Sequence, residues 1–170
     1  MSTTRPAIVL AGSLALCAGC AGAGPALTPT VQRGEKLAVM HQLVAALERG
    51  NHKCTIDGDG DALCDADRKD SPTVVISLHA GPAGVQLTFL AAFPWKTPDP
   101  CVRVVPAVNQ FNALSTSYFA VCTAQALVFE TIIVVPENGL TDHDVHAFMN
   151  WWEPTSVQLA LASPMASELK

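Results

Sequence analysis

An alternating run of aspartates over residues 57–67 has the spacing in this sequence that most directly suggests chemistry. Four carboxylates fall at positions 1, 3, 5 and 9 of an EF-hand count: Asp57, Asp59, Asp61 and Asp65. Carboxylate oxygens are ligands for hard cations, so the run predicts a candidate calcium site. Against calcium, Ala62 stands where such a loop needs glycine and Arg68 where it needs a bidentate glutamate. The alternative is a solvated turn with Asp and Gly in their usual places.

A pair of histidines, His143 and His146, suggests a second metal hypothesis. Their i, i+3 spacing places both imidazoles near one face of a helix. A catalytic zinc site needs a third ligand and an open position, and no spacing nominates a third histidine. We therefore expect these side chains to lie on the surface or near a helix end.

Sequence motifs typical of enzymes do not occur in the chain. It has no Gly-x-Ser-x-Gly, no His-Glu-x-x-His and no phosphate-binding loop. We expect no enzymatic activity and no cofactor other than the candidate calcium ion. Catalytic triads are recognised by geometry and not by their order in the sequence, so an unrecognised hydrolase stays as a third hypothesis for function.

Tryptophans are the candidate residues for protein contact. Trp151 and Trp152 are adjacent in a predicted helix, so both cannot face the same core, and Trp95 stands in a proline-rich loop. Tryptophan is enriched at binding hot spots, so the pattern predicts an exposed aromatic contact site, with core packing as the alternative. Asn109 and Asn112 are interpreted similarly, as amides that either bind a ligand or tie a helix to a neighbouring backbone group.

Four of the six cysteines fall in the body of the chain: Cys54, Cys64, Cys101 and Cys122. An even number in an exported chain indicates disulfides, and three pairings can be drawn. The hairpin register that opposes Asp57 to Asp61 also opposes Cys54 to Cys64, which favours this pair and leaves Cys101 with Cys122. The alternatives are reduced, buried thiols and a zinc site, although no Cys-x2-Cys spacing is present.

Residues 1–19 have the order of a secretory signal peptide. Arg5 supplies a positive charge, an apolar run follows, and small residues precede Cys20. The sequence Leu16-Cys17-Ala18-Gly19-Cys20 resembles the lipobox of bacterial lipoproteins, with Cys17 at the position that Leu usually holds. The resemblance implies cleavage before Cys20 and a lipid anchor on its thiol, which would hold the protein at a membrane.

Residues 20–30 are rich in Gly, Ala, Pro and Thr, and we expect them to act as a flexible tether. No acidic residue directly follows Cys20, so the resemblance to sorted lipoproteins implies the periplasmic face of the outer membrane in a Gram-negative cell. An ordinary cleaved signal peptide with a freely soluble product is the alternative.

Composition and charge restrict the classes of partner. Apolar residues make up 49% of the chain and charged residues only 15%, which indicates a folded domain. The formal net charge of −5 lacks the electrostatic attraction on which nucleic-acid binding depends, so we expect no DNA or RNA partner.

The rest of the chain predicts a single α+β domain over residues 31–165. The predicted elements are a helix over 31–49, a hairpin over 52–67, strands over 73–79 and 85–90, a helix over 102–114, strands over 116–122 and 126–135, a helix from 141, and a short last helix through 161.

Local signals mark the expected helix boundaries. Thr28-Pro29 is a start signal for the first helix, in which Leu37, Met40, Val44 and Leu47 fall at helical intervals. Pro106 is expected near the first turn of the second helix. Thr141 and Asp144 form an imperfect capping box for the third helix, and Pro154 is expected to end that helix after Trp152.

From about residue 102 onward a resemblance to a known family appears. The sequence Val108-Asn109-Gln-Phe-Asn112, a strand pair, and Gly139-Leu140-Thr141 opening a helix resemble the YbjN family, which is similar in fold to small chaperones of type III secretion. The resemblance implies a small α/β sandwich with an antiparallel sheet, in the order α-β-β-β-α-β-β-α. It also implies a regulatory or protein-binding role and, by analogy with secretion chaperones, the option of a homodimer.

The favoured function is therefore a non-enzymatic, protein-binding or chaperone-like module anchored in the cell envelope. The alternative is a calcium-responsive envelope module that uses the acidic hairpin. The lipobox, the four additional cysteines and the acidic hairpin depart from the YbjN pattern.

Overall fold

The computed structural model describes residues 31–65, 72–81, 84–97 and 100–170. In chain order its elements are α1 (Lys36–Arg49), β1 (Lys53–Ile56), β2 (Ala62–Asp65), β3 (Thr73–Gly81), β4 (Gly84–Pro94), α2 (Cys101–Leu114), β5 (Phe119–Cys122), β6 (Ala126–Val134), α3 (Asp142–Ala162) and the 3-10 helix η1 (Ala166–Glu168).

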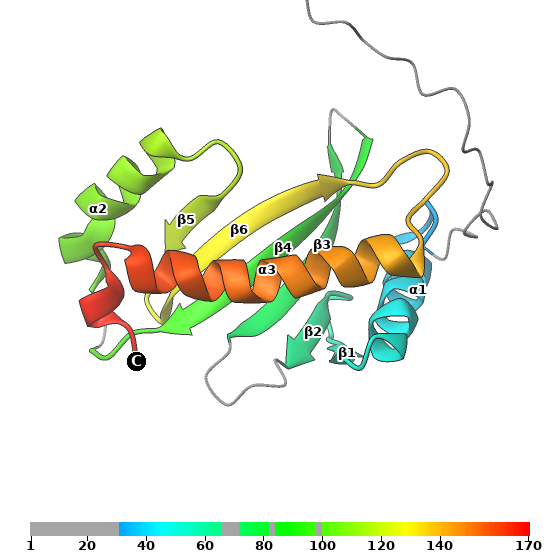
Figure 1. Ribbon diagram of the computed structural model, residues 1–170, viewed down its shortest axis with the longest axis horizontal. Coiled ribbons are helices and arrows are strands. Elements are labelled where there is room, and N and C mark those ends of the chain that lie inside the picture. The colour runs from blue at the N-terminus through cyan, green and yellow to red at the C-terminus, as the bar shows by residue number, and fades with distance from the viewer. Residues whose placement is uncertain (1–30, 66–71, 82–83, 98–99) are drawn as a thin grey trace, which may run out of the picture.

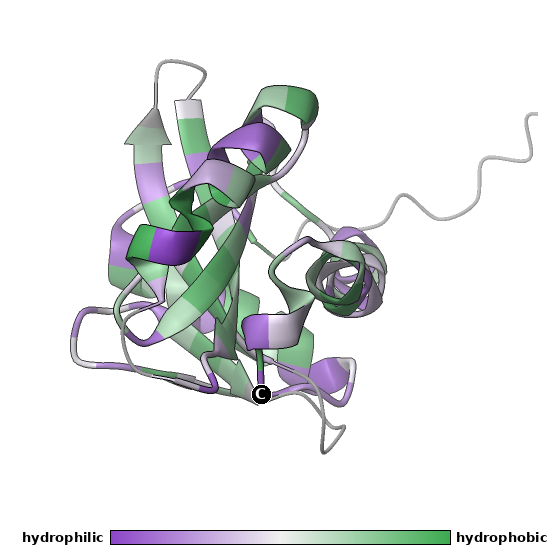
Figure 2. Ribbon diagram, turned by 90° about the vertical axis from the view of Figure 1, so that its left-hand side faces the viewer, coloured by the Kyte–Doolittle hydropathy of each residue, from purple (hydrophilic) through white to green (hydrophobic). Residues whose placement is uncertain are grey.

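The strands form one six-stranded antiparallel sheet in the order β1-β2-β3-β4-β6-β5. Helix α3 lies along one side of this sheet, with α1 at one end and α2 at the other (Figure 1). Figure 2 shows α3 nearly end-on, beside the sheet. The predicted α+β class is confirmed. The order differs from α-β-β-β-α-β-β-α, because four strands and not three precede α2, and the predicted short last helix through 161 is part of α3.

The core lies between the sheet and α3. Its largest fully buried side chains include Phe89 and Phe129 from the sheet and Met149 and Trp152 from α3. The rings of Phe89 and Phe148 lie 4.5 Å apart, which fixes the first half of α3 over β4. One helix-covered sheet face therefore supplies most of the apolar burial that stabilises the domain.

Helix α1 begins later than expected. Val31 pairs instead with Leu140, each backbone N–H donating to the other carbonyl at 2.9 and 2.8 Å. The helix then starts at Lys36, and Leu37 is 54% exposed, whereas Met40 and Leu47 are buried as expected. The predicted start signal at 28–29 lies outside the described residues.

Helix α3 runs through Pro154, so the predicted break is wrong. A proline inside a helix removes one hydrogen bond, here to the carbonyl of Asn150, which is exposed and can be solvated. Trp152 before the proline and Ser156 and Ala160 after it are all buried, so the packing continues across it. The capping box of Thr141 and Asp144 is complete.

Two smaller boundaries also differ from expectation. Pro106 lies in the second turn of α2, beyond the first turn where it was expected. The packed domain extends past residue 165, because Leu169 forms a β-bridge with Trp95 and is buried. None of the helices in the described residues is both long and apolar enough to cross a membrane.

Candidate functional site

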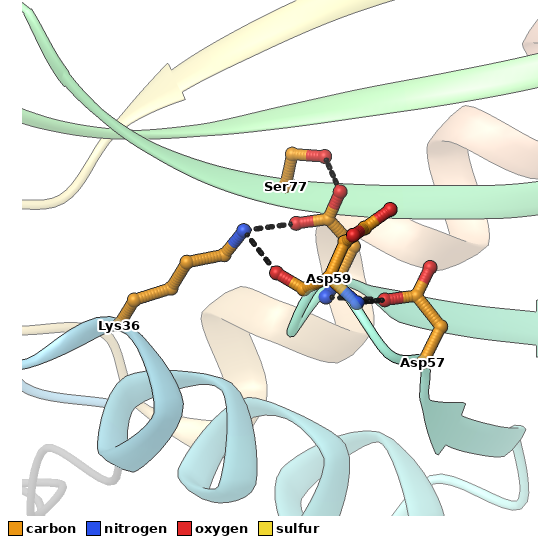
Figure 3. Close-up of polar contacts among 5 residues, drawn as sticks. Lys36, Asp57, Asp59 and Ser77 are labelled. Carbon is orange, nitrogen blue, oxygen red and sulfur yellow. Dashed lines mark hydrogen bonds and ion pairs between the residues drawn. The ribbon is translucent and has the colours of Figure 1, made fainter.

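The acidic hairpin positions its carboxylates through the turn between β1 and β2. Asp57 Oδ1 accepts hydrogen bonds from the backbone N–H groups of Asp59 and Asp61, at 2.9 and 3.0 Å (Figure 3). Gly60 has a φ of 78°, a conformation that glycine adopts without strain. Asp57 thus stabilises the turn itself, in the way that aspartates commonly do.

Asp61 forms an ion pair with α1. Its Oδ1 lies 2.7 Å from Lys36 Nζ, and its Oδ2 accepts a hydrogen bond from Ser77 Oγ at 2.7 Å. Lys36 also donates to the carbonyl of Asp59 at 2.9 Å (Figure 3). Burial raises the pKa of Asp61, but the hydrogen bonds from Lys36 and Ser77 outweigh it and hold the pKa below its usual value.

These contacts account for two of the four predicted calcium ligands. Asp57 and Asp61 are engaged by the turn and by Lys36, and the side chain of Asp65 lies outside the described set. Within the described ranges, no three His, Cys, Asp or Glu side chains gather as metal ligands would. Calcium binding stays the alternative hypothesis, and the contacts of Asp57 and Asp61 do not favour it.

The two histidines of α3 have different surroundings. His146 Nε2 lies 2.6 Å from the carbonyl oxygen of Ala46, so its ring links α3 to α1. His143 is exposed. A structural contact near the helix start thus accounts for one of the two imidazoles.

The tryptophans divide between core and surface. Trp152 is fully buried, and Trp95 is 4% exposed with its Nε1 donating to the carbonyl of Thr123 at 2.9 Å. The prediction of a protein contact is therefore corrected for these two residues, because core packing removes them from the surface. Trp151 is 41% exposed and stacks on Tyr118 with ring centroids 5.8 Å apart.

Both favoured cysteine pairs are bonded in the structure. Cys54 and Cys64 occupy opposite positions of the β1–β2 hairpin, as its register predicted. Cys101, the first residue of α2, is joined to Cys122 at the end of β5. The second bond holds α2 beside the outer strand of the sheet.

The side-chain amide of Asn112 closes the outer edge of β5. Its Nδ2 donates to the carbonyl of Ala120 at 2.9 Å, and its Oδ1 accepts from the N–H of Ala120 at 2.7 Å. The N–H and C=O of Ala120 point away from β6, so without Asn112 they would have no partner within the sheet. The structural interpretation of Asn112 is thus supported, while Asn109 is exposed on the same helix.

The sheet face opposite α3 carries apolar side chains that belong to no part of the described core. We call it the open face. The strand registers place the following apolar residues on it: Leu63, Val75, Leu90, Val128, Phe119, Val121, Ile132 and Val134. Phe119, Val121, Ile132 and Val134 are between 41 and 45% exposed. Contiguous exposed apolar surface of this kind marks interaction sites.

A groove of about 520 Å³ runs between the end of β6 and the first half of α3. Its lining includes Ile133 from β6, the loop residues Pro136 and Leu140, and Phe148 and Trp151 from α3. Apolar and aromatic side chains therefore supply much of its wall, with His143 and Asp144 as its titratable members. Among the predicted contact residues, Trp151 is the one that reaches this groove.

The open face could not be recognised from the sequence. The segment of β6 reads Ala-Leu-Val-Phe-Glu-Thr-Ile-Ile-Val and is apolar on both of its faces. Such a run is typical of a strand buried on both sides, so the pattern did not indicate that one face lacks a covering layer. The usable signal was the number of predicted helices, which is small for a sheet of this width.

Comparisons with known proteins are informative at the level of fold. No family model matches the chain, and no curated protein matches it by sequence. Among solved structures it is similar to YbjN, a candidate transcription regulator from E. coli, at 14% identity. The TM-score is 0.54, over 77% of this chain and 95% of that chain. This likeness confirms a YbjN-like α+β fold.

Proposed function

We propose that this chain is a non-enzymatic protein-binding module of the bacterial envelope that docks a partner protein on its open face. The observation that carries the proposal is the exposure of four large apolar side chains together: Phe119, Val121, Ile132 and Val134. Full burial of an exposed apolar side chain contributes about 1.5–3 kcal/mol. These side chains are 41 to 45% exposed, so a partner that covers one of them gains a little under half of that amount.

Charge favours a protein over a lipid surface as the occupant. Within the described part of the open face, the registers place Lys53 at one edge and Glu130 beside Phe119, and no arginine. The whole chain has a formal net charge of −5. An anionic bilayer attracts surfaces rich in Lys and Arg, and this face has neither the number nor the arrangement of such residues.

The anchoring part of the proposal comes from the lipobox resemblance. A lipid on Cys20 and a tether over residues 20–30 would present the domain, residues 31–165 and its C-terminal extension, near the membrane. We place it on the periplasmic face of the outer membrane of a Gram-negative cell. Replacing Cys20 with Ala should move the protein from the membrane to the soluble fraction, and continued membrane retention would contradict the anchor.

Site-specific photocrosslinking in cells tests the docking surface. A photoreactive residue at Phe119 should give a discrete crosslinked product, whereas one at Val102, which is 84% exposed on α2, should not. The product should disappear with Val121→Glu and persist with Val102→Glu, since only the first places a charge on the open face. Equal crosslinking from Phe119 and Val102, or no product from either, would sink the proposal.

A further inference from the structure

The end of β6 presents an unpaired backbone edge within the described sheet. β5 pairs only with residues 127–130 of β6, whereas β4 pairs with all of its residues from Ala126 to Val134. Val135 N–H donates to Val85 on the β4 side, and backbone groups alternate in direction along a strand. The N–H and C=O groups of Ile132 and Val134 therefore point away from β4, beyond the end of β5.

Side chains engage backbone groups of the chain next to this edge. Asn112 occupies the outward backbone groups of Ala120 in β5, and Thr131 Oγ1 donates to the carbonyl of Ser117 at 3.1 Å. Past Thr131, no described strand pairs with β6 on that side. An exposed edge with apolar, β-branched residues and no charge is a site for pairing with another extended chain.

The groove beside α3 lies next to this edge. Side chains of an added strand would alternate, one set entering the groove toward Phe148 and Trp151, the other set lying beside Ile132 and Val134 on the open face. The stack of Tyr118 on Trp151 supports one wall of the groove. The edge supplies backbone hydrogen bonds and the groove supplies side-chain selectivity, which is the arrangement of β-strand addition.

We propose that the edge at Ile132 and Val134 binds an extended segment of the partner as an added strand in line with β5. The proposal rests on the protein-binding function above and specifies its mode. The occupant carries apolar residues at alternate positions and at least one Lys or Arg. The basic residue follows from the carboxylates beside the groove, Asp144 in its lining and the exposed Glu137. The nearby guanidinium of Arg33 lies on the β4 side of β6, where it donates to the carbonyl of Val135 at 2.8 Å.

The probe for this test is the synthetic peptide acetyl-Lys-Thr-Val-Thr-Val-Thr-Val-Lys-amide, added to the full-length protein. Amide hydrogen exchange is measured by NMR. We expect exchange at Ile132 and Val134 to slow by about ten-fold or more, because their N–H groups gain acceptors. The amide of Ile133 is the internal control, since it faces β4 with or without the peptide.

Matched variants separate strand addition from general adhesion. N-methylation of the peptide along one edge should abolish binding and along the opposite edge should not, because a strand pairs through one edge only. Ile132→Pro should weaken binding about ten-fold, whereas Ile132→Val keeps the N–H and should bind as the wild type does. A peptide with Glu in place of both Lys residues should bind more weakly.

Several outcomes would overturn the proposal. The first two are the absence of binding at millimolar peptide and equal binding of the two N-methylated peptides. The third is slow amide exchange at Ile132 without peptide in a sample that sediments as a dimer, because a second copy of the chain would then occupy the edge. A crosslink through Phe119 without peptide protection at Ile132 overturns strand addition and leaves the proposed function standing. Loss of the crosslink overturns the function itself.

Discussion

β5 and the last residues of β6 border the same side of the sheet, but their outward backbone groups have opposite fates. At β5, the amide of Asn112 satisfies the N–H and C=O of Ala120 from α2. At β6, beyond residue 130, no described element takes that place at Ile132 or Val134. In β5 a single asparagine side chain satisfies the outward backbone groups. The end of β6 has no such side chain among the described residues, so its edge is left open for pairing.

The largest expected effect comes from releasing α2 from β5. Replacing Cys101 and Cys122 together with Ser should lower the free energy of unfolding by about 3 kcal/mol, because the disulfide closes a loop with a sequence separation of 21. Urea denaturation at neutral pH measures this change. The amide of Ala120 should also exchange faster, since Asn112 is no longer held beside it.

The matching pair is Cys54 and Cys64, whose sequence separation is 10. Its replacement by Ser should destabilise the protein by slightly less and leave exchange at Ala120 unchanged, because this bond lies at the opposite edge of the sheet. Equal exchange at Ala120 in both double variants would contradict the role of α2 in closing β5.

Asn112→Ala should destabilise the protein by about 1–3 kcal/mol, since it leaves both backbone groups of Ala120 without partners. It should also make β5 resemble the end of β6 and increase self-association in sedimentation velocity. Asn109→Ala is the control, because Asn109 is exposed on the same helix, and its effect should stay within about 0.5 kcal/mol. Similar effects from the two variants would break the contrast between the edges.

At the other end of the sheet, Asp61 of the acidic hairpin forms an ion pair with Lys36. The contribution of this pair to the free energy of unfolding is smaller and depends on pH. The pKa of Asp61 lies below its usual value, so ionised Asp61 stabilises the folded chain above the unfolded pKa of about 4 and loses this contribution as the pH falls through the folded pKa. Lys36→Met should cost about 0.5–1 kcal/mol at pH 7, as expected for a partly exposed pair.

That cost should shrink as the pH is lowered from 7 toward 2, because protonation of Asp61 removes the charge that pairs with Lys36. Chemical denaturation of both variants at the two pH values measures it. A difference that is the same at both values would show that Lys36 acts by packing and not through its charge.

The smallest effect is expected from calcium. At millimolar concentration it should leave the melting temperature within about 1 °C, because a ligand stabilises only when the native state binds it, and Lys36 and the turn backbone already engage Asp61 and Asp57. Differential scanning calorimetry with magnesium as the control checks this. A calcium-specific rise of several degrees would restore the acidic hairpin as a cation site.

Local signals predicted the elements well and their surroundings poorly. The capping box at Thr141, the hairpin register at Cys54 and Cys64 and the strand pair of β5 and β6 depend on residues close in sequence, and each formed as expected. The break at Pro154 failed because burial of Trp152 and Ser156 on either side outweighs one lost hydrogen bond.

The candidate site could be predicted only in part. Because Trp151 and Trp152 are adjacent in a helix, the sequence predicted that they could not both be buried in the same core, and only Trp151 is exposed. No local signal predicted that the chain end at Leu169 would pair with Trp95, which is buried. The open edge at Ile132 arises because β5 begins at Phe119 and not at residue 116 as predicted, so its pairing with β6 stops at Glu130.

The strand order also carries a consequence for the time course of folding. β1 to β4 follow one another as sequential hairpins, so they can assemble from local contacts as soon as that part of the chain is available. β6 reaches β4 only after α2 and β5 have been passed, and this pairing closes a longer loop. Until then β4 is itself an unpaired edge, open to pairing with another chain.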